Sequence, residues 1–143
     1  RLIHALYRAS RAGVPVRLVV RGICCLRPGV PGLSDNIRVR SIMGRFLEHS
    51  RIYRFANDGK PLTFGSSADW MERNLFQRVE TCFPIDDPKA AARVVHDSID
   101  LAFRDNIQAW ELRPDGHYHL LRPVDDEVRC SAQEILMERA ANA

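Results

Sequence analysis

Apolar side chains recur at helical spacing in three segments of the chain. Residues 2–13 place theirs on one face and end at a glycine, which predicts a helix. Residues 86–110 predict a longer helix, because Asp87 can cap its start, Pro88 suits its first turn and the apolar positions form one stripe. Residues 130–141 predict a third, short amphipathic helix.

β-branched and aromatic residues mark the predicted strands. Residues 14–26 form a nearly continuous apolar run, which is typical of a central strand buried on both faces of a sheet. Residues 51–58 and 60–69 are joined by turn residues and predict a hairpin. Further strands are predicted at 37–42, 76–85 and 117–123, with a loop at 27–36 and a short helix at 43–49.

This order of elements predicts the fold class. Helices and strands are interspersed, so we expect an α/β or α+β sandwich with a mixed β-sheet flanked by helices. A length of 143 residues suits one domain, and we expect residues 1–143 to form a single one.

Composition narrows the class of protein. The chain is 45% hydrophobic and 27% charged, as soluble globular proteins are, and its apolar runs are too short for a membrane-spanning helix. It begins at Arg1 without a secretory signal, which predicts a fragment of a longer cytoplasmic protein with reduced cysteines; peripheral membrane attachment stays open. His117 and His119 have no further ligands nearby, so no metal site is predicted within the chain.

Positive charge is concentrated in the first part of the sequence. Residues 1–54 contain eleven arginines against two acids, a charge of +9, whereas residues 55–143 carry −6. Nineteen of the twenty-one basic residues are arginine, whose planar donor fork matches phosphate oxygens. A compositional preference for arginine explains the ratio equally well, but the clustering favours a surface that faces a polyanion.

Three sequence blocks carry a resemblance to a known family. RGICCLRPGVPGLSDNIRVRSIMGRFLEHSRIY, GSSADWMERN and RVETCFPI, in this order and spacing, resemble the final catalytic domain of the polyphosphate kinases. With their flanks, the blocks cover nearly the whole chain. The resemblance implies a phospholipase D-like fold and a C-terminal catalytic fragment of a longer enzyme.

Two residues of these blocks are the first candidates for the site. Arg21 matches a family arginine that contacts nucleotide or polyphosphate phosphates, and His49 matches a family histidine in the same site. Arg21 is also expected to end a buried strand, and ligands of open α/β sheets bind beyond strand ends. A histidine at the end of a helix or strand often has only a structural role, but the neighbours of His49 favour a functional one.

Those neighbours resemble the phospholipase D superfamily. His49 and Arg51, followed by Gly65, Ser66 and Ser67, resemble its His-x-Lys and Gly-Ser pattern, with arginine in place of lysine. That superfamily builds one phosphate site from two halves, each with a histidine. In polyphosphate kinases the phosphorylated histidine belongs to the preceding domain, and its segment is absent here, so the resemblance implies acid/base assistance for His49.

Other polar residues are weaker candidates. Phosphoryl transfer depends on neutralising negative charge that is spread over several oxygens. Contacts with ATP or polyphosphate are therefore also predicted for four further arginines, although each could be a surface side chain. They are Arg38, Arg40, Arg45 and Arg51. Ser66 and Ser67 could donate hydroxyl hydrogen bonds to a phosphate oxygen. Asp69 could orient His49 or an arginine, or cap the following turn.

The implied function is that of a polyphosphate kinase. The intact enzyme would move the terminal phosphate of ATP reversibly onto polyphosphate through a phosphohistidine, with Mg²⁺, and this fragment alone would be inactive. Its partners would be ATP or ADP, polyphosphate, the upstream domains and, in the full-length enzyme, a second copy; nucleic acid is not expected. Two alternatives stay open: half of a phospholipase D-type nuclease or phosphodiesterase site, and a noncatalytic polyanion-binding module.

Overall fold

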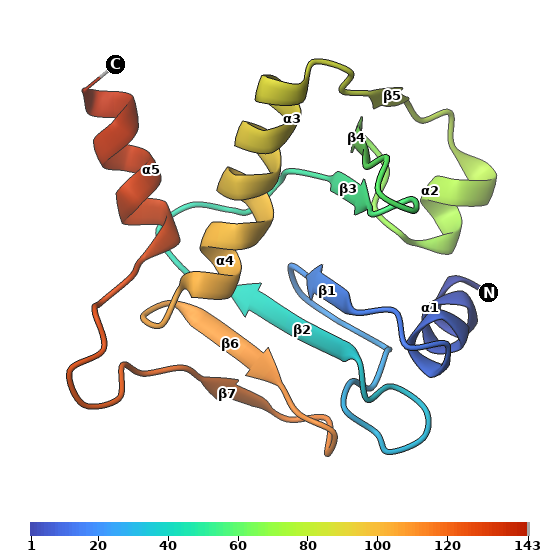
Figure 1. The fold of residues 1–143 in the computed structure, drawn as a ribbon, viewed down its shortest axis with the longest axis horizontal. Helices are drawn as coiled ribbons and strands as arrows, with labels where there is room; N and C mark the ends of the chain where they lie inside the picture. Colours follow the sequence, from blue (N-terminus) through green and yellow to red (C-terminus); the bar gives the residue numbers. More distant parts are fainter. Residues whose placement is uncertain (143) are drawn as a thin grey trace. The chain divides into compact units, whose positions relative to one another are not determined.

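The computed structural model describes residues 1–142 and divides into two compact units. Unit 1 comprises Arg1–Glu48 with Leu101–Ala143, and unit 2 comprises His49–Asp100 (Figure 1). The single domain predicted for residues 1–143 stays a prediction.

Unit 1 is built on a mixed four-stranded sheet. Its strands lie in the order β1-β2-β6-β7, with β1 parallel to β2 and the other pairs antiparallel. Three helices belong to the same unit. The elements of unit 1 are α1 (Leu2–Arg11), β1 (Val16–Val19), β2 (Ile37–Ile42), α4 (Leu101–Arg104), β6 (Ala109–Leu112), β7 (Tyr118–Leu120) and α5 (Ala132–Ala141).

Unit 2 contains a smaller antiparallel sheet in the order β3-β4-β5. The first two strands form the predicted hairpin, and its turn places Asn57, Asp58 and Gly59 at positive φ, where these residue types are tolerated best. The elements of unit 2 are β3 (Ile52–Phe55), β4 (Leu62–Ser66), α2 (Glu72–Gln77), β5 (Cys82–Pro84), α3 (Pro88–Val95) and a π-helical turn at His96–Asp100.

The main core of unit 1 lies between α1 and the sheet. Ile37, Val39, Leu26 and Leu112 are buried there, and apolar side chains of α1 pack against them. Burying each such side chain contributes about 1.5–3 kcal/mol. The apolar face predicted for residues 2–13 therefore packs against the sheet and forms part of the core.

Local signals predicted several element boundaries correctly. The helix that begins at Pro88 is capped as expected, because the Asp87 side chain accepts a hydrogen bond from the Ala90 amide at 2.7 Å. Ser131 caps α5 in the same way, although its bond to the Glu134 amide is longer, at 3.4 Å. Residues 27–36 form the predicted loop, in which the amides of Gly29, Val30 and Gly32 donate hydrogen bonds to Ser34 and Asp35.

Three predictions of secondary structure were wrong, and the strand predicted at 76–85 begins too early, since 76–77 belong to α2 and β5 covers Cys82–Pro84. The run 14–26 contains only the four-residue β1, which is an edge strand, while the central position belongs to β2. Residues 43–49 form no helix. The long helix ends at Arg104, and residues 109–112 are the strand β6. The first run turns at Gly22, whose φ is +94°, whereas side-chain contacts from Gln133 and Asp105 hold the other two segments out of a helix.

Among the described residues, no helix combines the length and the apolar character that crossing a bilayer requires.

Candidate functional site

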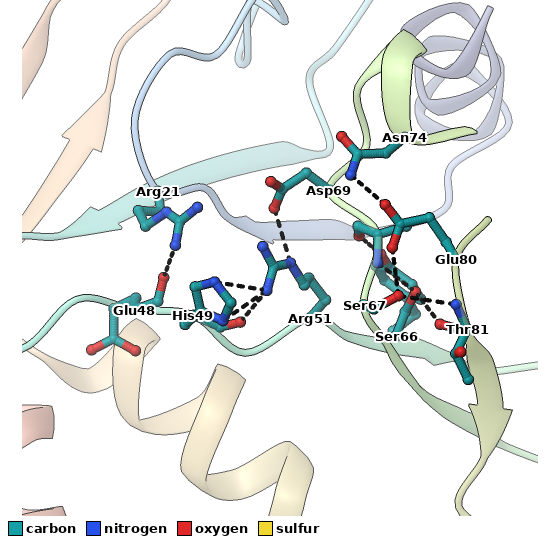
Figure 2. A network of polar contacts seen from close by, with 12 residues as sticks. Arg21, Glu48, His49, Arg51, Ser66, Ser67, Asp69, Asn74, Glu80 and Thr81 are labelled. Atoms are coloured by element: carbon teal, nitrogen blue, oxygen red, sulfur yellow. Dashed lines mark hydrogen bonds and ion pairs between the residues drawn. The ribbon is translucent and has the colours of Figure 1, made fainter. Parts of the chain in front are cut away.

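Arg21 lies two residues beyond the end of β1 in unit 1. The next residue, Gly22, has φ +94°, so the chain turns immediately after Arg21 in a conformation that favours glycine. Arg21 is exposed, and its Nη1 donates a hydrogen bond to the main-chain oxygen of Glu48 at 3.0 Å (Figure 2). The predicted placement after a strand is confirmed, but that strand is at the sheet edge and only partly buried.

His49 begins unit 2, and its ring is in contact with Arg51. Arg51 Nη1 lies 2.9 Å from Nδ1 and 3.3 Å from Nε2 of His49, and it donates to the His49 main-chain oxygen at 2.8 Å. Arg51 Nε in turn donates to Asp69 Oδ1 at 3.0 Å. Because a guanidinium can only donate, Asp69 and His49 hold Arg51 between two acceptors (Figure 2).

Asp69 therefore binds an arginine, which was one of its two predicted alternatives. The N-cap position of α2 is occupied by Met71, and the predicted capping role of Asp69 stays a prediction. The Arg51 and Asp69 side chains are 16% and 29% exposed, so their ion pair is shielded enough to fix the guanidinium beside His49.

The hydroxyl groups of Ser66 and Ser67 bind within unit 2. Ser66 Oγ donates to the Thr81 main-chain oxygen at 3.0 Å, and Ser67 Oγ donates to Glu80 Oε2. Asn74 Nδ2 donates to the other Glu80 oxygen at 2.6 Å. The phosphate contacts predicted for both serines stay predictions, and each hydroxyl would have to release an internal acceptor to make one.

Glu80 is the charged centre of this network. Hydrogen bonds from Ser67 and Asn74 hold the pKa of its carboxyl below the ordinary range, since both stabilise the ionised form. Glu80 thus locks the Ser66–Ser67 turn against the segment that enters β5. It lies within the RVETCFPI block, but nothing in the sequence singled it out, because its partners lie 13 and six residues away.

The predicted ligands Arg38 and Arg40 belong to a cluster on one face of the unit 1 sheet. Both guanidinium groups approach Glu111, at 3.1 Å for Arg38 and 3.8 Å for Arg40, and both lie over the Phe103 ring. Arg38 is 55% exposed, whereas Arg40 is buried and donates to main-chain oxygens at the end of α4. These contacts support an internal role for Arg40, and its predicted ligand role stays a prediction.

The candidates are distributed over both units. Arg21, Arg38, Arg40 and Arg45 belong to unit 1, and Arg45 lies over the ring of its neighbour Phe46. The remaining candidates belong to unit 2 and are His49, Arg51, Ser66, Ser67 and Asp69. Among residues 1–142, no three His, Cys, Asp or Glu side chains are grouped so that they could hold a metal ion.

The mixed α/β fold, with exposed arginine and histidine groups outside its strands, is typical of domains that bind phosphate-bearing ligands.

Comparison with known proteins narrows this class to one family. Residues 1–133 match the family model described as polyphosphate kinase C-terminal domain 2, and the chain belongs to this family. It is 57% identical over 137 residues to a polyphosphate kinase of Xylella fastidiosa (strain Temecula1) and 55% identical over 141 residues to one of Pseudomonas aeruginosa. These alignments cover 96% and 99% of the chain but 20% of each relative, so the chain spans about a fifth of their length.

A solved structure supports the same assignment. The crystal structure of polyphosphate kinase from Porphyromonas gingivalis matches with a TM-score of 0.90 and 42% sequence identity, over 99% of this chain and 21% of that chain. The family membership and the mixed α/β fold class predicted from the sequence are thereby confirmed.

Proposed function

We propose that this chain is part of a polyphosphate kinase, an ATP:polyphosphate phosphotransferase that moves the terminal phosphate of ATP reversibly onto polyphosphate. The observation that carries the proposal is the family match over residues 1–133, together with 55–57% identity to polyphosphate kinases across nearly the whole chain. Because the chain spans about a fifth of these relatives, it would supply one part of a composite site.

Arg21 is proposed to contact the phosphates of ATP or polyphosphate. Its exposed guanidinium is a planar fork of donors that matches phosphate oxygens, and one of its N–H groups binds the Glu48 carbonyl. That contact restricts the orientation of the side chain. Phosphoryl transfer depends chiefly on such positioning and charge neutralisation.

His49 is proposed to assist proton movement and not to form the phosphohistidine, which would lie in a preceding domain. Its exposed imidazole is the kind of group that exchanges a proton with a transferring or leaving oxygen. Arg51, which is held by Asp69, fixes the His49 ring and places a positive charge next to it. That charge suits a ligand rich in phosphate oxygens.

Mg²⁺ is expected for the whole enzyme, where it would neutralise charge on the phosphates. The described residues offer no cluster of three protein ligands, and Mg²⁺ is usually held by one or two carboxylates, waters and substrate phosphates. We therefore assign no Mg²⁺ ligand in this chain.

The roles of Arg21 and His49 can be tested in a full-length polyphosphate kinase that carries this chain. We expect Arg21→Ala to lower kcat/KM for ATP about 10- to 100-fold through the loss of charge-assisted hydrogen bonds. We expect His49→Ala to lower kcat about 100-fold or more, as general acid/base groups do.

Matched controls are Arg93→Ala, whose side chain is 83% exposed, and His119→Ala on the exposed face of β7. Both controls should retain wild-type kinetics. Full activity in both the Arg21 and His49 variants would overturn the assignment of this site.

A further inference from the structure

The segment that links β2 to His49 has no helix or strand to hold it. Residues 43–48 are irregular, and Met43, Phe46 and Leu47 are 65%, 50% and 72% exposed, so apolar packing contributes little to its position. Yet Glu48, at its end, supplies the carbonyl that binds Arg21. The segment must therefore be fixed by polar contacts.

The Met43 amide donates to the main-chain oxygen of Gln108 at 3.0 Å, and one buried side chain makes the contacts closest to Glu48. Gln133, near the start of α5, is 4% exposed. Its Nε2 donates to the Phe46 main-chain oxygen at 2.8 Å and to Glu48 Oε1 at 2.7 Å, while its Oε1 accepts from the Phe46 amide at 3.0 Å. The side-chain amide thus binds both polar groups of one peptide residue, as a neighbouring strand would.

Gly44 is required by the same arrangement. A Cβ atom at this position would lie 2.3 Å from Gln133 Oε1, which is too close for any real contact. The sequence therefore provides a glycine where the buried amide approaches the segment, although φ of Gly44 is not in the left-handed region.

The position of Gln133 is itself fixed from two sides. Ser131 caps the first turn of α5, and the buried Asp105 carboxylate accepts the Ala132 amide at 2.7 Å. Buried polar networks of this kind are rigid when all their members are paired. The amide of Gln133 is consequently presented to the segment in one orientation.

We propose that Gln133 is a positioning residue for Arg21, acting through Glu48. This inference rests on the function proposed for Arg21. Gln133 holds the side chain of Glu48 and the adjacent main chain of Phe46, while the main-chain oxygen of Glu48 holds the guanidinium of Arg21. Loss of the amide lets the segment move, and the Glu48 carbonyl is then no longer held where it binds Arg21.

The most direct variant is Gln133→Glu. It removes both donated hydrogen bonds and places a carboxylate beside that of Glu48, whose oxygen lies 2.7 Å from Gln133 Nε2. A glutamate in the first turn is favourable for a helix, so this change does not weaken α5 itself. In the full-length enzyme we expect kcat/KM for ATP to fall about tenfold, mainly through KM.

Exchange of the two partners provides the rescue. In the double variant Glu48→Gln/Gln133→Glu the donor and acceptor are swapped, and the carboxylate at 133 can still accept the Phe46 amide. We expect kcat/KM to recover at least about threefold from the Gln133→Glu level. Gln77→Glu, an exposed position at the end of α2, is the matched control and should match wild type.

A double-mutant comparison with Arg21→Ala separates a positioning role of Gln133 from an effect on overall stability. In an Arg21→Ala background, Gln133→Glu should cause no further loss in kcat/KM, because its effect passes through Arg21. The inference would be overturned if Gln133→Glu lowered kcat/KM in the Arg21→Ala background by the same factor as in wild type. It would also be overturned if the double variant Glu48→Gln/Gln133→Glu kept a wild-type Tm but recovered no kcat/KM.

A structural readout keeps the inference distinct from the proposed function. If Arg21→Ala leaves kcat/KM unchanged, the function proposed for Arg21 fails, and NMR of this 143-residue chain decides the inference. Gln133→Glu should then accelerate hydrogen exchange of the Phe46 amide and shift the Arg21 Nε–H signal. Unchanged exchange and an unchanged signal would overturn it.

Discussion

Arginine side chains in this chain occupy two different environments. Arg21 is exposed and donates a hydrogen bond to the main-chain oxygen of Glu48, whereas Arg40 is buried among oxygens at the end of α4 and the Glu111 carboxylate. Burial lowers the pKa of Arg40, since desolvation disfavours its charge, and its Nε has no hydrogen-bond partner among the described residues. Arginines in one sequence cluster thus differ in role.

Replacement of Arg40 tests its internal role. We expect Arg40→Met to reduce the free energy of unfolding by about 3 kcal/mol, because buried carbonyls and Glu111 lose a charged partner. Arg38→Met is the matched control on the same strand. Its side chain is 55% exposed, so we expect a loss below about 1 kcal/mol. Equal losses in urea unfolding would contradict an internal role specific to Arg40.

Glu80 predicts a dependence of stability on pH. Its pKa is held below the ordinary value of 4.5, so its stabilising contribution is complete above that pH and disappears as pH falls through the lowered pKa. We expect the Tm of wild type to exceed that of Glu80→Gln at pH 5, and this difference in Tm to shrink as the pH is lowered further. Asp86→Asn, at an exposed acid, controls for net charge. A constant Tm difference down to about pH 2 would refute this account.

At the scale of elements, one buried carboxylate joins three of them. Asp105 Oδ1 accepts the amides of Ile107, Gln108 and Ala109 at 2.7–3.0 Å, and its Oδ2 accepts that of Ala132. These bonds end the helix, start β6 and fix the first turn of α5. The strand at 109–112 exists where a helix was predicted because this carboxylate uses the amides that a helix would need.

Asp105→Asn tests this junction. The NH₂ group of the asparagine would face either the Ala132 amide or the amides of residues 107–109. Because these groups are all donors, one hydrogen bond would be replaced by a repulsive contact. We expect a loss of about 2–3 kcal/mol in the free energy of unfolding, measured with urea. Asp125→Asn is the matched control, because Asp125 lies at φ 49° and asparagine tolerates that conformation well. A loss at 105 no larger than at 125 would contradict the role of the junction.

Local sequence signals predicted those elements whose causes are local. The capped start of α3 and the hairpin turn are examples, since Asp87 and Asn57–Gly59 act within a few residues. The irregular segment 43–48 was predicted as a helix because its holding contact comes from Gln133, 85 residues from Glu48. Likewise, Arg21 and His49 became candidates through family motifs, and their roles stay predictions. The sequence did not indicate Gln133 or Glu80, because only the fold brings their partners together.

At the scale of the whole molecule, the charge asymmetry of the sequence is reduced by folding. Unit 1 combines the basic first part with the acidic last part and has fourteen arginines against ten acids, a charge of +4. Unit 2 has a charge of −1. Net charge alone therefore does not identify either unit as one that binds polyanions. The proposed phosphate contacts rest instead on individual side chains whose positions are fixed by hydrogen bonds, such as Arg21 and the Arg51–His49 pair.

The central claim is that this chain completes a composite phosphotransfer site and does not act alone. The most direct test combines it with the upstream four-fifths of a polyphosphate kinase, such as that of Pseudomonas aeruginosa, and measures ATP formed from ADP and polyphosphate. We predict ATP only when both parts are present, and its loss with the Arg21→Ala chain. ATP formation by the upstream part alone, or phosphodiester hydrolysis by this chain alone, would contradict the claim.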